Sequence, residues 1–480
     1  MKLNISLAMF SVLLSAAAQA DDGIRQFLAG RAGHDAEVAQ SIWNWAEVGY
    51  QEVKSSALLQ KELATAGFKV EAGVAGMPTA FIASWGKGEP LIGILAEYDA
   101  LPGITQDASP LRKPLPDKHS AHACGHHLFG AASVSAAIAL KDWLQKSRTP
   151  GTIRLYGTPA EEGGAGKVYM VRAGLFKDVD AVLHWHPSDT NSAGLDRSLA
   201  NKTAKFRFHG VSSHASGAPD RGRSALDAVE AMDNMVNMMR EHVPSDARIH
   251  YVITSGGSAP NVVPDFAESY YYVRHGDPRV VEEIFDRVVK AAEGAALGTG
   301  TTMDYEVIGG VYSILPNETL ARVMYSKLAE VGGMSYSPDE QAFAETLYSS
   351  LMKPNMPLGS ESDVQDFDFE RPGIGSTDVA DISWNVPTTG LRVATWVPGT
   401  SAHSWQAAAA GGMSIGFKGM QHASQVLALT GQEIFTHPEL IAKARAELEK
   451  RRGPDFQYTP MLGDRAPALD YRRGVQGGGE

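Results

Sequence analysis

The fold of this chain is constrained above all by a series of short apolar runs, which alternate with longer segments of helical periodicity. Residues 79–85 and 91–96 are apolar runs bounded by Gly or Pro, which predicts two strands. Similar runs over 153–157 and 181–187 predict two more, and the Ala-rich residues 126–145 predict a helix between the two pairs. Strands that alternate with helices predict an α/β sheet with both faces covered.

The pattern of predicted strands and helices changes near residue 202. Alternating side chains over 205–209 predict a strand, and the Met-rich amphipathic residues 224–240 predict a helix. Two strands, a helix and a last strand follow up to residue 307. This β-α-β-β-α-β order is that of a ferredoxin-like unit. We therefore expect an α+β domain inserted between the two halves of a larger α/β domain.

The chain of 480 residues is too long for one compact core. The tail beyond about residue 453, with its Pro, Gly and scattered charge, is expected to be loosely ordered. The predicted parts are a signal peptide (1–20), the first part of the larger domain (21–201), the inserted domain (202–310), the second part of the larger domain (311–435), and a C-terminal helix and tail (436–480). The formal net charge of −12 argues against a nucleic-acid partner.

The N-terminus has the pattern of a cleaved secretory signal. Lys2 supplies an early positive charge, and the apolar residues 5–14 are too few to span a bilayer. Ala18 and Ala20 stand at the two positions that a signal peptidase reads. We expect an exported, periplasmic protein whose mature chain begins at Asp21 and has no membrane span. An uncleaved anchor is the alternative.

Residues 122–127 hold the only cysteine of the chain and three of its 15 histidines. A lone Cys cannot form an intramolecular disulfide, and an exposed free thiol is a liability in an oxidising compartment. Thiolate sulfur and neutral imidazole are ligands that borderline-soft divalent metals prefer. The stretch therefore indicates a metal site, although a buried Cys beside His is also common in ordinary cores.

More ligand-type residues stand at the ends of predicted strands. Glu161 and Glu162 follow the strand over 153–157. Because neighbouring side chains of an extended segment point to opposite sides, one carboxylate could bind metal while the other faces the substrate as a general base. A solvated pair of glutamates in a loop is the ordinary alternative.

Three histidines and one aspartate complete the candidates. His184 and His186 are two residues apart on a predicted strand and so share a face, where either could be a ligand. His403 lies in a polar loop before an Ala-rich helix. Asp99 ends a strand and could orient a ligand histidine or cap the next turn. Each histidine by itself is more commonly a surface or core residue.

Two motifs suggest other chemistries. Gly412–Gly416 matches the Gly-x-Ser-x-Gly pattern of serine hydrolases, but helical patterns surround it, which indicates close helix packing. Gly163–Lys167 is similar to a phosphate loop, but Val168 replaces the required Ser or Thr.

Taken together, these segments resemble the co-catalytic metallo-amidohydrolases that include hippurate hydrolase, aminoacylases and indole-acetyl-amino-acid hydrolases, and above all the B-subunit group of the aminobenzoyl-glutamate hydrolases. The resemblance runs from about residue 30 to about residue 435. The segments that carry it are Ala96–Pro102, His122–His126, Pro159–Gly163, Ser213–Ala215, Pro219 with Gly222–Ala225, Ala259–Asp265 and Ala402–Trp405.

The resemblance implies a metallopeptidase-type catalytic domain that holds two divalent metal ions per subunit, Mn²⁺ or Zn²⁺. Cys124 would bridge the two ions as a thiolate, and Glu161 would be the general base. The other ligands would be one glutamate and three histidines: His126, Glu162, His186 and His403. Asp99 would stand behind the ligands and orient one of them.

The inserted domain would serve as a lid or dimerisation domain. His214 and Asn261 would bind substrate, with His214 reaching across the boundary between two subunits. A homodimer is therefore expected, with or without a second related subunit. Two departures from many relatives, His127 after the Cys-Gly-His motif and the segment 376–381, fit the B-subunit group and leave the substrate pocket open.

The implied reaction is hydrolysis of the amide bond of a small molecule, an N-acyl amino acid or an aminobenzoyl-glutamate-like substrate, by a metal-activated water with Glu161 as base. A dipeptidase on the same scaffold and a catalytically silent binding protein are the alternatives. The presence of Glu161 and of every proposed ligand argues against a silent protein. The acyl group, the metal and a contact of His184 with the metal site stay open.

Overall fold

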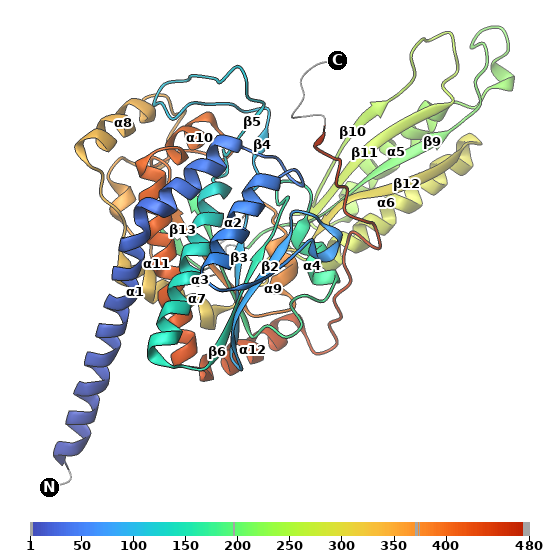
Figure 1. Cartoon of the computed structure of the whole chain (residues 1–480). Helices are drawn as coiled ribbons and strands as arrows, with labels where there is room; N and C mark the ends of the chain where they lie inside the picture. The colour runs from blue at the N-terminus through green and yellow to red at the C-terminus, as the bar shows by residue number, and fades with distance from the viewer. Residues whose placement is uncertain (1–2, 195–196, 370–372, 374, 474–480) are drawn as a thin grey trace.

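The computed structural model describes residues 3–194, 197–369, 373 and 375–473, and over 3–22 it describes the backbone alone. The chain forms a large α/β body from which an elongated arm projects (Figure 1). Residues 1–20, the predicted signal peptide, lie outside the residues whose side chains are described. Among the described residues, no helix combines the length and the hydropathy that crossing a bilayer requires.

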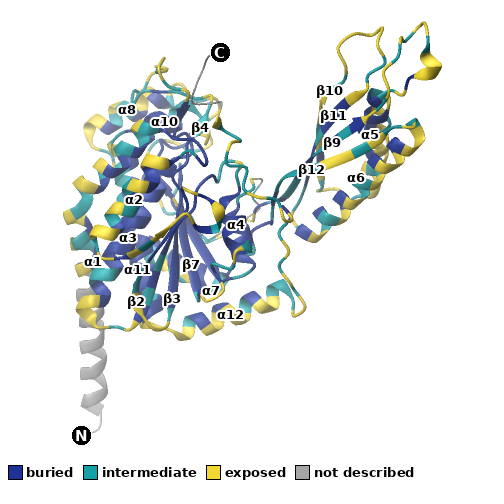
Figure 2. Cartoon of the chain, turned by 45° about the vertical axis from the view of Figure 1, so that its right-hand side comes forward, coloured by how far each residue is buried: buried dark blue, intermediate teal, exposed yellow. Residues whose placement is uncertain are grey.

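The body is built around a seven-stranded sheet in the order β1-β2-β6-β3-β7-β13-β8. Its strands are β1 (Lys69–Ala72), β2 (Phe81–Lys87), β3 (Leu91–Ala96), β6 (Gly151–Gly157), β7 (Ala181–Ser188), β8 (Ser192–Ala193) and β13 (Thr388–Ala394). The four neighbours β6, β3, β7 and β13 are parallel. Every residue of β3 is buried, as a continuous apolar run predicts for a strand covered on both faces (Figure 2). The predicted mixed α/β class is confirmed.

The helices of the body cover this sheet. They are α1 (Leu3–Trp45), α2 (Val53–Thr65), α3 (His126–Ser147), α4 (Gly166–Arg172), α7 (Glu318–Val331), α8 (Pro338–Tyr348), α9 (Val379–Ser383), α10 (Trp405–Gly411), α11 (Ser414–Thr436) and α12 (Glu439–Arg452). Helix α3 packs against α1 and α11 and against strands β3, β6 and β7. Gly412–Gly416 lies at the junction of α10 and α11, where a Cβ on Gly416 would come within 2.8 Å of the Gly411 carbonyl oxygen. The motif therefore belongs to helix packing, as expected.

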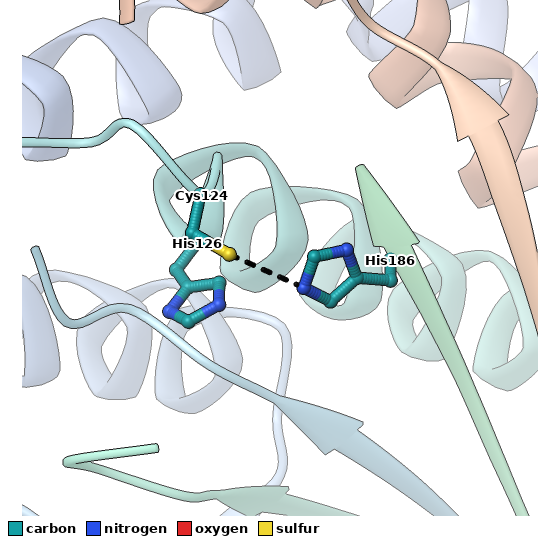
Figure 3. A group of neighbouring side chains, drawn as sticks. All are labelled: Cys124, His126 and His186. Carbon is teal, nitrogen blue, oxygen red and sulfur yellow. Dashed lines mark hydrogen bonds between the residues drawn. The ribbon is translucent and has the colours of Figure 1, made fainter. Parts of the chain in front are cut away.

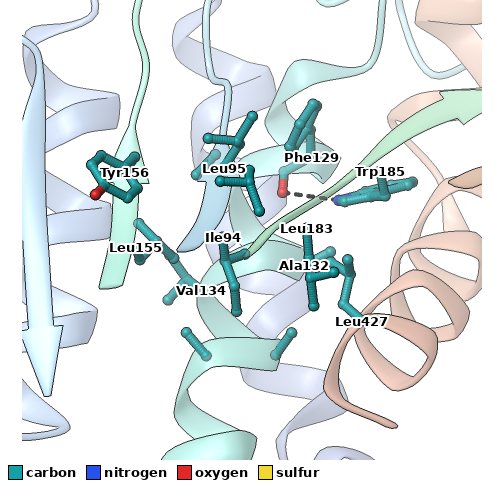
Figure 4. Packing of buried hydrophobic residues seen from close by; sticks show 14 of the residues in the cluster. Ile94, Leu95, Phe129, Ala132, Val134, Leu155, Tyr156, Leu183, Trp185 and Leu427 are labelled. Atoms are coloured by element: carbon teal, nitrogen blue, oxygen red, sulfur yellow. Dashed lines mark hydrogen bonds between the residues drawn. The ribbon is translucent and has the colours of Figure 1, made fainter. Parts of the chain in front are cut away.

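The core of the body places the start of α3 beside the ends of the strands. Side chains of β3, β6 and β7 pack against the Ala-rich face of α3 (Figure 4). Trp185 of β7 donates a hydrogen bond from Nε1 to the Phe129 carbonyl of α3, at 3.2 Å. At Gly130 of α3, a Cβ would come within 2.8 Å of the Glu97 carbonyl oxygen, so this glycine allows the helix to approach the end of β3 closely. This packing positions His126, the first residue of α3, at the edge of the sheet where β3 and β7 end.

The arm is an antiparallel sheet in the order β10-β11-β9-β12 with two helices packed on it. Its elements are β9 (Ala200–His209), α5 (Ala225–Met239), β10 (Arg248–Ser255), β11 (Phe266–His275), α6 (Pro278–Thr299) and β12 (Thr302–Val311). Ser224 and Asp277 cap α5 and α6, because their side chains accept hydrogen bonds from backbone N–H groups of the first turns. The elements follow one another in the order expected from the sequence.

The C-terminal tail differs from the expectation. Residues 454–472 form no α-helix and no β-strand, yet Met461 and Leu462 are each only 3% exposed. Met461 packs so closely on Gly310 of β12 that a Cβ on this glycine would lie 2.6 Å from the Met461 Cβ. The expectation of a loosely ordered tail is therefore wrong for residues 454–473. Its Pro and Gly content indicates the absence of regular structure and says nothing about packing.

Candidate active site

A cavity of about 540 Å³ opens beside the carboxyl ends of the parallel strands. Its lining includes residues that follow β3, β6 and β7, together with the loops before α3 and α10. Open α/β sheets place their sites at this edge, because the loops that leave parallel strands converge there. Seven residues predicted from the sequence as site candidates line this cavity or belong to the groups of possible metal ligands described below. They are Cys124, His126, Glu161, Glu162, His184, His186 and His403.

Cys124, His126 and His186 form a first ligand group, with one ligand atom from each within 4.8 Å of the others (Figure 3). The Sγ atom of Cys124 lies 3.5 Å from Nε2 of His186. Gly125, between Cys124 and His126, has a φ of 79°, and a Cβ there would come within 2.6 Å of the Pro187 side chain. The glycine of the Cys-Gly-His motif is thus required by both backbone conformation and space.

Cys124, Glu162 and His403 form a second group within the same limit. Nε2 of His403 lies 3.0 Å from Oε1 of Glu162. Cys124 belongs to both groups, so its sulfur stands where one atom could contact two cations at once. This arrangement fits a bridging thiolate.

Glu97, His126 and Glu161 form a third group, and Glu97 was missed in the sequence. Glu97 precedes Asp99 by two residues after β3, and this spacing was a usable signal because residues two apart in an extended segment share a face. Oε2 of Glu97 lies 3.1 Å from Nε2 of His126. Nδ1 of His126 lies 2.9 Å from Oδ1 of Asp99, so the two ring nitrogens face two carboxylates. Although burial acts against the charged ring, its neighbours raise the pKa of His126 well above the usual range.

The side-chain atoms of these groups have the surroundings expected of ligands to a cation. Nε2 of His126 and Oε2 of Glu97, 3.1 Å apart, are close enough to be ligands of one cation, which would take the place of a proton on the ring. Oε2 of Glu97, Nε2 of His126 and Oε1 of Glu162 are buried and have no hydrogen bond of ordinary geometry, although Glu97 faces His126 and Glu162 faces His403. Buried polar atoms without a hydrogen bond are costly, and divalent cations held by these ligand groups would satisfy them. Burial also raises the pKa of the Cys124 thiol, so a thiolate here needs a cation beside it.

Asp99 joins two of the groups through its carboxylate. One oxygen accepts the hydrogen bond from His126, and the other accepts the backbone N–H of Glu162, at 2.9 Å. Asp99 therefore orients a histidine side chain and also the backbone of a glutamate. The sequence suggested the first of these contacts alone.

Glu161 and Glu162 lie in a turn and not in an extended segment. Ala160 has a φ of 58°, and the N–H groups of Gly163 and Gly164 bond back to the carbonyls of Glu161 and Ala160. The argument from strand alternation is therefore wrong, because the strand ends at Gly157. The turn nevertheless separates the two carboxylates, since Glu161 joins Glu97 and His126 while Glu162 joins Cys124 and His403.

A buried lysine offsets part of the negative charge. Lys167 is completely buried, and its Nζ lies 2.7 Å from Oε1 of Glu97 and 2.7 Å from Oδ1 of Asp378. Although burial acts against its charge, these carboxylates raise the pKa of Lys167 above its usual value. Burial and the neighbouring carboxylate of Glu97 raise the pKa of Glu161 well above its usual range. Lys167, part of the segment similar to a phosphate loop, is therefore a counter-ion to the carboxylates of the site.

The other two histidines of the Cys-His stretch have structural partners. The rings of His122 and His127 lie 4.8 Å apart, and their Nε2 atoms contact the carbonyls of Ile42 and Gly411, at 3.1 and 2.9 Å. Burial lowers the pKa of His127 to about 3, so the ring is neutral. Both side chains tie the loop to neighbouring helices, and neither belongs to a ligand group of the described residues.

His184 shares the cavity with His186, as expected for two residues on one face of a strand. Its ring stacks on Phe129 at 6.2 Å, and burial lowers its pKa to about 3. It is absent from the ligand groups found among the described residues.

His214 and Asn261 do not line the cavity. Both lie in loops of the arm, where His214 pairs with Val262 in an isolated bridge and Asn261 is exposed. Nδ1 of His214 accepts a hydrogen bond from the backbone N–H of Gly217, at 3.1 Å. Within one chain the structure therefore does not bring these two residues to the other site residues.

Arg197 and Arg392 also line the cavity, and the sequence analysis missed both. Arg392 lies on β13 opposite His186, and it is the exposed residue of a strand whose other residues are buried. A single charge inside the apolar run 388–394 was the available signal. Both arginines also interact with other groups of the chain. Both bring positive charge to the cavity, and Arg392 does so beside His186.

Comparisons with known proteins agree with this geometry. Residues 93–359 match peptidase family M20/M25/M40. The chain is 39% identical to the B subunit of p-aminobenzoyl-glutamate hydrolase from Escherichia coli (strain K12), over 88% of this chain and 94% of that protein. It is 29% identical to a Homo sapiens Xaa-Arg dipeptidase, over 86% of this chain and 88% of the dipeptidase.

Solved structures share the fold at low identity. The YXEP protein of Bacillus subtilis, described as a dinuclear metal binding peptidase of the M20 family, has a TM-score of 0.60 and 17% identity, over 85% of this chain and 99% of that one. An aminobenzoyl-glutamate utilization protein from Klebsiella pneumoniae has a TM-score of 0.61 and 17% identity, over 85% and 97%.

Proposed function

The chain belongs to peptidase family M20/M25/M40 and is a hydrolase that acts on amides, and on this premise we propose that its substrate is an aminobenzoyl-glutamate-like amide or another N-acyl amino acid. The observation that carries the proposal is the pair of ligand groups that share Cys124 beside Glu161 in one cavity. The relative with 39% identity, named for p-aminobenzoyl-glutamate, supports this substrate class.

The residues present fit two divalent cations, for which we propose Mn²⁺ or Zn²⁺. Cys124 would contact both, and the remaining ligands would be His126, Glu162, His186 and His403. When bound, such a pair of ions lowers the pKa of a shared water and polarises the scissile carbonyl. Glu161 would accept the proton of the attacking water on its carboxylate and return it to the nitrogen of the leaving amine.

The positive charge of the cavity favours a substrate that carries a carboxylate. The guanidinium of Arg392 matches a carboxylate in charge and shape, and Arg197 lines the same cavity. A substrate would join or exchange with the contacts that these arginines already make. A dipeptide that ends in arginine, the kind of substrate that the name Xaa-Arg dipeptidase indicates, also has one carboxylate, but its side chain would add a cation to a cavity that already holds two arginines. Arg392 therefore supports the anionic amide over the dipeptide.

The test is a substrate panel assayed by release of the free amine, after loading with Mn²⁺, Zn²⁺ or Co²⁺. It includes p-aminobenzoyl-glutamate, an N-benzoyl amino acid with a neutral side chain, and a dipeptide that ends in arginine. We expect the glutamate amide to have the highest kcat/KM, and we expect Arg392→Gln to raise its KM more than that of the neutral amide. Preference for the arginine dipeptide would favour the dipeptidase alternative. If the metal-loaded protein hydrolyses none of these amides, the result would favour the alternative of a catalytically silent binding protein.

We further propose that the protein is exported to the periplasm and acts as a homodimer. Residues 1–20 have the composition of a signal peptide, which supports export. The positions of His214 and Asn261 outside the cavity of their own chain support a dimer in which a partner chain supplies them. A second, related protein stays open as a partner, since the chain is also 24% identical to the A subunit of p-aminobenzoyl-glutamate hydrolase from Escherichia coli, over 65% of this chain.

A further inference from the structure

The last described residues of the C-terminal tail contact the turn that carries Glu161 and Glu162. Nη2 of Arg472 donates a hydrogen bond to the carbonyl oxygen of Glu162, at 2.9 Å, and the Tyr471 hydroxyl donates to the same oxygen, at 3.3 Å. Two side chains from the far end of the sequence thus hold one backbone atom of a proposed ligand residue.

Residues of the α/β body hold the backbone of Glu162 from the other side. The N–H of Glu162 donates to Asp99, and two residues further on the carbonyl of Gly164 accepts the Tyr50 hydroxyl at 2.8 Å. The turn contains two residues with positive φ, Ala160 at 58° and Gly163 at 101°. Besides its two internal backbone hydrogen bonds, the turn is therefore held by partners that come from distant parts of the chain.

The contact of the tail with the body is closely packed. The ring of Tyr471 meets that of Tyr50 edge-on, with centroids 5.7 Å apart. A Cβ on Gly49 would lie 2.2 Å from the Tyr471 hydroxyl, so this glycine makes room for the tyrosine. Gln51 donates to the carbonyl of Leu469, at 2.9 Å. The last described residues are therefore built into the surface beside the site.

Further back, the tail contacts both the body and the arm. Arg172 of α4 donates to the carbonyls of Gly463 and Arg465, at 2.8 and 2.7 Å. On the arm side, Arg465 donates to the carbonyl of Val307 on β12, at 2.6 Å. In Figure 1 the dark red C-terminal segment runs between the body and the arm. One continuous segment thus joins the inserted domain to the Glu161–Glu162 turn.

We propose that the C-terminal tail, residues 454–473, is a positioning element of the active site. Arg472 and Tyr471 are positioning residues, because they touch the backbone of Glu162 and not the substrate or a metal ion. They hold the turn so that the Glu162 carboxylate faces Cys124 and His403. The role given to Glu162 rests on the proposed function, whereas the hold on the turn does not.

The experiment compares Arg472→Ala and Tyr471→Phe with Arg473→Ala, a matched control at an exposed neighbouring arginine. Hydrogen exchange of residues 160–168 is measured in the full-length protein without metal or substrate. Mn²⁺ affinity is then measured by direct titration. We expect faster exchange of the turn in both variants and, for Arg472→Ala, a loss of Mn²⁺ affinity on the order of tenfold, the size typical of changes to residues that support ligands. Arg472→Lys keeps a cationic donor and should recover part of both effects, while Arg473→Ala should match the parent.

Unchanged exchange and unchanged Mn²⁺ affinity in Arg472→Ala would overturn the proposal and leave the tail as a cover for the surface. If Arg472→Ala does not fold, Tyr471→Phe and Arg472→Lys decide by the same two measurements, with parental values counting against the proposal. Since exchange is measured without substrate, a protein that hydrolyses no amide but shows the exchange effect would refute the proposed function and leave the positioning role standing.

Discussion

At the scale of single residues, Cys124 connects the two proposed metal positions. Its sulfur is shared by two ligand groups, and burial raises the pKa of its thiol. A thiol that keeps its proton binds metal poorly, so cation and thiolate depend on each other. The thiolate of Cys124 is therefore expected only when metal ions occupy the site.

Replacement of Cys124 by alanine should therefore remove metal and turnover together. We expect elemental analysis of purified Cys124→Ala to show loss of both ions, because the shared ligand is gone. Cys124→Ser is the matched control for volume, and its hydroxyl, which does not ionise at neutral pH, should restore little. A Cys124→Ala protein that keeps its full metal content would refute the bridge.

The two adjacent glutamates should respond differently to the same substitution. Glu161→Gln removes a base while keeping shape, so metal content should stay and kcat should fall by about 10²–10⁴-fold or more. Glu162→Gln should weaken metal affinity, and excess metal should restore part of its activity. Parental behaviour of both variants would indicate a solvated pair. Metal loss in Glu161→Gln alone would exchange the two roles.

At the scale of elements, β13 must leave room for the ring of His184. A Cβ on Gly390 of β13 would lie 2.3 Å from Nε2 of His184, whose ring is buried against Phe129. The strand can pair with β7 at this position only because residue 390 has no side chain. Gly30, on the exposed side of α1, has no atom near its missing Cβ within 4 Å.

Alanine at these two glycines should have opposite effects on stability. Gly390→Ala should destabilise the protein by about 1–3 kcal/mol, because the new Cβ would collide with the buried ring of His184. Gly30→Ala should stabilise it by about 0.5–1 kcal/mol, because alanine loses less entropy in a helix. The midpoint of thermal unfolding measures both. A Gly390→Ala midpoint at or above the parental value would contradict the crowding at His184.

At the scale of the whole molecule, the position of the arm separates His214 from the cavity of its own chain. If a partner chain supplies His214, inactive chains should complement each other. Mixed His214→Ala and Glu161→Gln chains should recover about a quarter of the parental activity, because half of the random dimers are mixed and each mixed dimer holds one intact site. Absence of any recovery after exchange of chains would place the action of His214 within its own chain.

Export makes a separate prediction for the whole chain. Cleavage after Ala20 should leave a mature protein that begins at Asp21, because Ala18 and Ala20 are small enough for signal peptidase. The intact mass of the native protein checks this. A mass that still includes Met1 would favour the uncleaved anchor.

Much of the fold and part of the site could be predicted from local patterns. Strand β3 ends at Ala96 as expected, since a continuous apolar run has the same meaning wherever it lies. Cys124, His126 and His186 fall into one ligand group because local motifs deliver them to the ends of neighbouring elements. The pattern failed at Glu161 and Glu162, where a turn with positive φ follows the strand sooner than the argument assumed.

The sequence by itself determined the class of the fold, the order of elements in the arm and the ligand types at the strand ends, because these depend on side-chain period and on spacing over a few residues. Tertiary structure alone decided the partners that come from far apart in the chain. Lys167 pairs with Glu97 and Asp378, and Arg472 reaches Glu162 across the surface of the body. No local pattern encodes such pairs, because burial, which sets the cost of leaving a charge or a carbonyl without a partner, is known only once the whole chain has packed.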